Sequence, residues 1–111
     1  GYSNTSGFNN NFIGDETGYS NTIGRYNNFI GTTAGHSLTN GISNNFMGDR
    51  AGYFMTNGSS NVYIGDDAGY NNKTGNNNVF LGARSAWNDT ATAYNVIIGA
   101  DAAYNNMQGD D

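Results

Sequence analysis

The sequence repeats itself every 17 residues without an insertion or a deletion. The clearest marker is a glycine that follows two large apolar residues, and it recurs at Gly14, Gly31, Gly48, Gly65, Gly82 and Gly99. An unbroken period of this kind is typical of a solenoid, in which each unit is one coil stacked on its neighbour. We number the marker glycine as slot 1 of a coil with slots 1 to 17. Residues 1–111 then form a single repeat domain of about 6.5 coils.

The pattern within each coil favours β-structure. Large apolar residues are adjacent instead of recurring every three or four positions, and Gly and Asn interrupt the chain too often for a helix. We therefore predict an all-β parallel β-solenoid with two short strands per coil, centred on slots 15 to 17 and on slots 5 to 7. Turns are expected at slots 1 to 3 and at the glycine of slot 11. Coils stacked at ~4.8 Å would give a length of about 31 Å.

The large residues at slots 16 and 17 need cover on both sides of their strand. Adjacent strand residues point to opposite faces, so one faces the coil interior and the other a partner, for which another copy of the chain is the plainest candidate. We expect slots 6 and 17 to line the interior and slot 16 to contact the partner, or slots 16 and 17 to exchange these roles. Slot 16 holds Phe12, Phe29, Phe46, Tyr63, Phe80 and Ile97; slot 17 holds Ile13, Ile30, Met47, Ile64, Leu81 and Ile98; slot 6 holds Tyr2, Tyr19, His36, Tyr53, Tyr70, Trp87 and Tyr104. Because a thin coil buries little surface alone, association is expected to be part of the fold.

Slot 14 is asparagine in every coil: Asn10, Asn27, Asn44, Asn61, Asn78 and Asn95. In a solenoid each would lie next to its counterparts above and below, so the amides could form a hydrogen-bonded structural ladder. Asparagine also tolerates a left-handed backbone at a turn. The sequence leaves both roles open, and neither is catalytic.

Composition excludes several classes of function. The sequence has no Cys and no Pro, which removes disulfide scaffolds, Cys-ligated zinc and thiol catalysis. A net charge of −5 argues against a nucleic-acid partner, and no apolar run approaches the ~20 residues of a membrane span. The chain begins at Gly1 and is interrupted within a coil at both ends without a cap. We therefore expect an excised or mature piece that belongs to a longer run of the repeat or stacks end to end into a filament.

The sequence offers no arrangement typical of an enzyme. His36 is the only histidine and stands in slot 6, where other coils have Tyr or Trp, so we interpret it as a member of a stack. The acidic pairs Asp15-Glu16, Asp66-Asp67 and Asp110-Asp111 make no slot uniformly acidic, and sequence neighbours point apart. We predict no catalytic residue, no metal site and no cofactor, although Asp and Asn oxygens could ligate calcium.

Two segments, residues 77–82 and 94–99, resemble the Asn-Ser-Val-Ala-Ile-Gly motif of head repeats in trimeric autotransporter adhesins. The resemblance implies a left-handed parallel β-roll in which three chains pack into a stiff trimer that holds out an adhesive surface. The Asn-Asn-x-Phe-Ile-Gly-x-x-Ala-Gly-Tyr run is also similar to repeats in long fibre proteins of phages and environmental bacteria. Residues 64–69 fit one hexapeptide of the left-handed β-helix acyltransferases, but the period of 17 breaks the triangular register of that fold.

We expect a structural and adhesive segment of an extracellular fibre, on a cell surface or a virion, whose rigid shaft presents a polar Asn- and Thr-rich surface. Expected partners are copies of the chain itself, as a trimer or an end-to-end filament, and a surface glycan or host receptor. The main alternative is a phage tail-fibre or tailspike segment that binds host polysaccharide. Two further alternatives are a self-assembling filament of another role and ice binding by a row of threonines at slot 9. That row, Thr5, Thr22, Thr39, Thr56 and Thr90, is broken by Lys73 and Met107.

Overall fold

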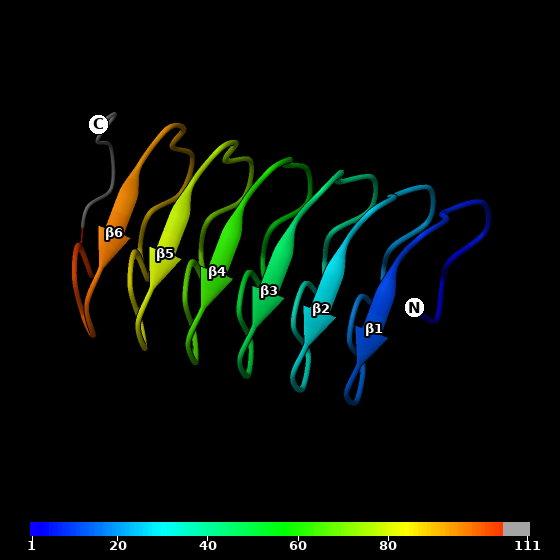
Figure 1. Ribbon diagram of the computed structural model, residues 1–111, viewed down its shortest axis with the longest axis horizontal. Coiled ribbons are helices and arrows are strands. Elements are labelled where there is room, and N and C mark those ends of the chain that lie inside the picture. The colour runs from blue at the N-terminus through cyan, green and yellow to red at the C-terminus, as the bar shows by residue number, and fades with distance from the viewer. Residues whose placement is uncertain (106–111) are drawn as a thin grey trace.

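The computed structural model describes residues 1–105 as a parallel β-solenoid with one strand in each coil (Figure 1). The strands are β1 (Asn11–Ile13), β2 (Asn28–Ile30), β3 (Asn45–Met47), β4 (Val62–Ile64), β5 (Val79–Leu81) and β6 (Val96–Ile98). They form one parallel sheet in sequence order, and each residue pairs with the residue 17 positions further on. The predicted all-β parallel solenoid with 17-residue coils is confirmed. Met107, Gly109 and the pair Asp110-Asp111 lie outside the described residues.

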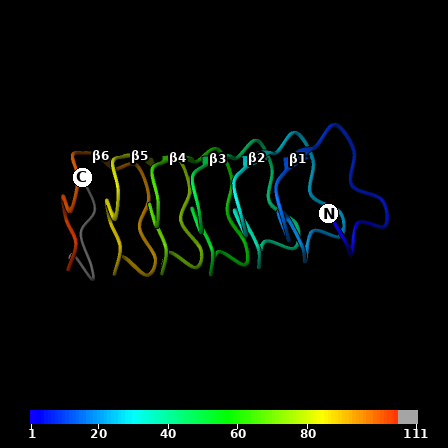
Figure 2. The ribbon, with the colours of Figure 1, turned by 90° about the horizontal axis from the view of Figure 1, so that it is seen from below.

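The coils stand in single file and follow the same path from the blue to the orange end (Figure 2). Five full turns separate β1 from β6, and the molecule measures 34 × 22 × 16 Å. The long dimension agrees with the length of about 31 Å expected from the coil count.

Backbone geometry limits each strand to three residues. The residue at slot 13, two positions before the strand, has a φ of 56 to 64° in all six coils, and the slot-1 glycine that follows the strand has a φ of 127 to 136°. Residues that carry a side chain seldom adopt either of these positive φ values. The chain therefore bends sharply on either side of slots 15 to 17. The turn predicted at slots 1 to 3 is present.

The second strand predicted at slots 5 to 7 is wrong. Slots 3 and 5 both adopt positive φ, at 49 to 59° and 52 to 63°, and this alternation folds the segment into tight turns. Hydrogen bonds between coils continue through these turns: Gly35 N donates to Ala51 O at 2.9 Å, and Asn71 N donates to Trp87 O at 3.1 Å. The segment is therefore stacked like a strand without being extended. Outside the named strands, isolated parallel bridges join slot-12 residues such as Arg25 and Ile42.

The slot-11 glycines allow neighbouring coils to stack closely. They do not adopt the positive φ of a left-handed turn. Gly75 is buried, and a Cβ placed on it would lie 2.6 Å from Thr92 O in the next coil and 2.6 Å from Asn78 Nδ2. Gly58 is confined by the coil that follows it in the same way. Within the described residues slot 11 departs from glycine once, at Thr92, and the partner of that side chain is described below.

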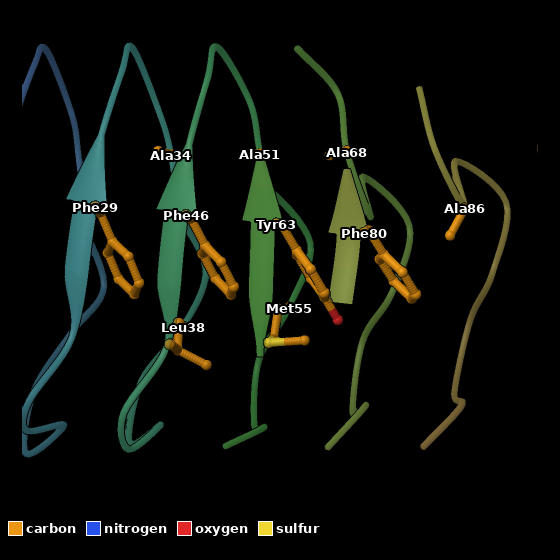
Figure 3. Close-up of a cluster of buried hydrophobic side chains, with 10 residues drawn as sticks. All are labelled: Phe29, Ala34, Leu38, Phe46, Ala51, Met55, Tyr63, Ala68, Phe80 and Ala86. Carbon is orange, nitrogen blue, oxygen red and sulfur yellow. The ribbon is translucent and has the colours of Figure 1, made fainter. Parts of the chain in front are cut away.

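The core is a single column of aromatic rings on the inner side of the strands (Figure 3). Phe29, Phe46, Tyr63 and Phe80 at slot 16 are fully buried, and with Phe12 their rings stack at centroid distances of 4.6 to 5.2 Å. Small residues at slot 4 and the side chains of Leu38 and Met55 at slot 8 fill the remaining interior. The coil thus has room for one large ring per turn.

This narrow interior decides between the expected arrangements. Slot 16 lies inside and slot 17 points outward, which is the second of the two alternatives for these slots. The prediction that slot 6 lines the interior is wrong, because the slot-16 ring already occupies that space. Gly35 of slot 5 packs against the ring of Phe29, where an added Cβ would come within 2.5 Å of a ring carbon. The slot-6 side chain that follows is consequently directed outward.

Replacement of one marker glycine should reveal how tightly the coils stack. In Gly65→Ala the new Cβ would lie 2.5 Å from the carbonyl carbon of Gly82, whereas in Gly99→Ala its nearest contact would be Ala102 Cβ at 3.6 Å. Both glycines have φ near 130°, so both variants share a backbone cost of ~1–2 kcal/mol. We expect Gly65→Ala to lose at least ~2 kcal/mol more than Gly99→Ala in urea unfolding. Equal losses would contradict the close stacking.

Candidate functional site

Four surfaces or ladders of identical slots could carry function. They are the Asn ladder at slot 14, the aromatic column at slot 6, the charged turns at slots 2 and 3, and the sheet face, by which we mean the outward side chains of β1 to β6 at slots 15 and 17. Each repeats along the whole stack because every coil presents the same slot to the same side.

The Asn ladder lies inside the coil, and its amides are hydrogen-bonded to one another from Asn27 to Asn95. Asn44 donates from Nδ2 to Oδ1 of Asn27 at 3.1 Å and to Gly58 O at 2.8 Å, and its backbone N donates to the same Oδ1 at 3.0 Å. Asn61 and Asn78 make the same three contacts one and two coils further on. Of the two roles left open, the amide ladder is the one present. Positive φ belongs instead to slot 13, the preceding residue.

One buried polar pair was not foreseen from the sequence. Where slot 11 changes from Gly to Thr92, slot 8 of the same coil is Asp89, and Thr92 Oγ1 donates to Asp89 Oδ2 at 2.5 Å. Both residues are buried. The added hydroxyl is therefore paired with a carboxylate inside the coil. The signal in the sequence was the departure of slot 11 from Gly at Thr92, three residues after Asp89.

The aromatic column runs along the outside of the stack. Six consecutive pairs have ring centroids 4.9 to 5.5 Å apart and interplanar angles of 21° or less. The column comprises Tyr2, Tyr19, His36, Tyr53, Tyr70, Trp87 and Tyr104. Ring faces are turned to each other and most of the rings are half-buried, so mainly ring edges reach solvent. His36 is a stack member between Tyr19 and Tyr53, and its Nε2 lies 3.8 Å from Glu16 Oε2.

The sheet face is an exposed and uncharged surface. Ile13, Met47, Ile64 and Ile98 of slot 17 are exposed, with 67% exposure for Ile98, while Ile30 and Leu81 are half-buried. Slot 15, in the parallel row beside it, is Asn in β1 to β3 and Val in β4 to β6. No Asp, Glu, Lys or Arg occupies slots 15 to 17 of any coil. The sequence predicted an outward apolar row here, and the structure assigns it to slot 17.

Charges collect on the turns at slots 2 and 3. Arg50 donates to Asp67 at 2.9 Å, and Arg84 donates to both carboxylate oxygens of Asp101 at 2.6 and 2.8 Å. The hydrogen bonds from Arg84 hold the pKa of Asp101 below its ordinary value. Burial raises the pKa of Asp67 against the opposing effect of Arg50. Within residues 1–105, no three His, Asp or Glu side chains come together in a manner that could hold a metal ion.

The threonine row at slot 9 takes part in coil stacking. The hydroxyls of Thr5, Thr22, Thr39 and Thr56 each donate to the carbonyl of the slot-9 residue in the next coil, at 3.0 to 3.2 Å. The hydroxyl protons are thus used within the chain, which weakens the interpretation of this row as an ice-binding surface.

Comparisons with protein-family models, curated proteins and solved structures found no significant match to this chain. The described residues contain no helix that is long and apolar enough to cross a membrane.

Removal of one ladder amide should be far more harmful than removal of its exposed neighbour. Asn61→Ala leaves Asn78 N and Gly75 O without their buried partners and removes the amide bonds to Asn44 and Asn78, and each unsatisfied buried group costs ~1–3 kcal/mol. We expect Asn61→Ala to lose at least ~3 kcal/mol of unfolding free energy. The control Asn45→Ala, on the sheet face, should change it by less than ~0.5 kcal/mol. Similar losses in the two variants would contradict a structural ladder.

Tyr63 should make the fold sensitive to alkali. Burial raises the pKa of its phenol well above the ordinary value of 10.0. The folded state therefore keeps a proton that the unfolded chain releases above pH ~10, and stability falls there by up to ~1.4 kcal/mol per pH unit. Tyr63→Phe introduces the residue found at this slot in both neighbouring coils. Its melting temperature should fall less steeply than that of the wild type between pH ~9 and ~11. Parallel curves would contradict this assignment.

Proposed function

We propose that this chain is a structural segment of an extracellular fibre, a rigid repeat shaft that presents a polar surface. The observation that carries the proposal is the continuity of the coil-to-coil contacts, because the parallel strand pairing continues in one register from β1 to β6. A stack of coils that is ordered along one axis can act as a rigid spacer between whatever is attached to its two ends.

Three parallel sets of contacts support stiffness. The Asn ladder lies inside, the slot-16 rings stack beside it, and the aromatic column stacks on the outer surface. Aromatic pairs add ~0.5–1.5 kcal/mol each beyond burial. Bending the stack would have to separate members of at least one set, so the three together oppose bending in different directions.

The aromatic column favours a structural role over a sugar-binding one. Aromatic rings that bind sugars use their faces, and the faces of these rings are occupied by one another. An adhesive contact would instead involve the Ser, Thr and Asn side chains of slots 7, 9 and 10 on the turn-rich side, which include the exposed Thr39, Asn40 and Asn57. We place the fibre on a cell surface or a virion on the basis of the sequence resemblances alone.

Self-association is part of this proposal. The slot-17 row of Ile, Met and Leu lies outside the coil, and burying one such side chain is worth ~1.5–3 kcal/mol. A shaft of a single coil width would leave the row in water, so copies of the chain are its proposed cover.

A spacer should accept whole coils but not fractions of a coil. We propose duplicating residues 48–64 after residue 64 and comparing this variant with one whose inserted copy lacks Ser60. The complete insertion should keep the fold and lengthen the particle by ~4.8 Å in solution X-ray scattering. The shortened insertion should lower the melting temperature markedly, because it shifts every ladder past the insertion. If the complete insertion unfolded the protein or left its length unchanged, the shaft proposal would be wrong.

A further inference from the structure

The sheet face changes character halfway along the stack. Slot 17 is apolar in all six coils, but slot 15 is Asn11, Asn28 and Asn45 in β1 to β3 and Val62, Val79 and Val96 in β4 to β6. The two rows lie side by side on one surface, since both point outward from the same strands. One half of the face therefore alternates polar and apolar rows, and the other half is apolar in both.

In the polar half, some of the hydrogen-bonding groups of the asparagine side chains already have partners within the chain. Asn11 Nδ2 donates to Asn28 Oδ1 at 3.0 Å across β1 and β2. A primary amide has two N–H groups and two acceptor positions, so its remaining groups depend on water. Covering this half with an apolar surface would remove that water without replacing its hydrogen bonds, which is unfavourable.

The side chains of the apolar half have no hydrogen-bonding groups that need water. This half consists of Val62, Ile64, Val79, Leu81, Val96 and Ile98, on the green-to-orange strands of Figure 1. Ile64, Val96 and Ile98 are exposed, and Val62, Val79 and Leu81 are half-buried. Contiguous exposed apolar side chains of this kind mark interaction surfaces.

We infer that a second copy of this chain docks on the apolar half, against β4 to β6, while the face of β1 to β3 stays in water. This inference rests on the self-association proposed above and restricts it to one half of the sheet face. The contact is isologous, with the same six side chains on both copies.

Two features of the surface favour a second copy as the occupant. The chain carries a net charge of −5, yet no charged side chain lies on the face, so two copies can meet there without opposing carboxylates. The side chains also stand in straight rows with one row member per coil. A second copy has the same strand spacing and therefore offers ridges that fit between these rows along their full length.

Matched substitutions in the two halves test the inference. Leu81→Asp and Ile30→Asp place the same carboxylate at the same slot of a central strand, and both side chains are half-buried in the single chain. Sedimentation over a concentration series should show a wild-type oligomer that persists in Ile30→Asp. Leu81→Asp should raise its dissociation constant by at least ~100-fold, because a carboxylate cannot be buried unpaired. Circular dichroism would verify that both variants are folded.

A milder pair covers the case in which Leu81→Asp disturbs the fold. Val79→Asn introduces the residue that slot 15 already holds in the first three coils, and it should weaken association by ~10-fold or more. Its counterpart Asn28→Val should leave the dissociation constant within ~3-fold of the wild type. If all the substitutions weaken association, or none does, the restriction to β4 to β6 is wrong. A wild-type chain that remains monomeric at millimolar concentration would overturn the proposed self-association itself.

Discussion

The amide ladder at slot 14 is the interaction on which the other regularities of this solenoid depend. Each asparagine holds the backbone of the next coil through its Oδ1 and the slot-11 carbonyl of the next coil through its Nδ2, so it ties two parts of that coil to one point. These two bonds fix the spacing between slot 11 and slot 14 in the next coil. Buried hydrogen-bonding groups must be paired, so the ladder holds each coil in register with the one before it, and the stacked rings and threonines repeat in that register.

The second determinant is the narrowness of the coil. The interior accepts one large ring per turn, and Gly or Ala is needed where the chain passes over that ring. Most other bulky residues lie at the surface, which is how a chain with 36% hydrophobic residues comes to display both an aromatic column and the apolar row of slot 17. The apolar surface is therefore exposed because the coil interior has no room for more than one large ring per turn.

Much of this architecture could be predicted from the sequence because its period is exact. The position of the strand, the stacked coils and the fact that slots 16 and 17 face opposite ways all follow from the repeat and from strand alternation. The tight turns at slots 3 to 5 could not be recognised, since residues as different as Glu16, Thr33 and Arg50 adopt positive φ there. The mistaken prediction of a second strand also gave the wrong orientation for slot 6. In an extended strand the slot-6 side chain would point into the coil, whereas the tight turns direct it outward. The Asp89–Thr92 contact was missed because it exists in one coil only and a repeat analysis averages over exceptions.

The direction of the coil-to-coil hydrogen bonds has a mechanical consequence. They run along the long axis of the stack, so tension applied between its two ends loads the junctions between coils in series, and the whole column is as strong as its weakest junction. Among the described coils, the two end junctions differ from the others. Between β1 and β2 the side-chain amide of Asn27 makes no bond to Asn10 Oδ1, which accepts from Asn27 N instead. Between β5 and β6 the Asn95 to Asn78 amide contact lengthens to 3.4 Å, and Ile97 replaces the core ring of slot 16. Under tension these end junctions would open before those in the middle of the stack.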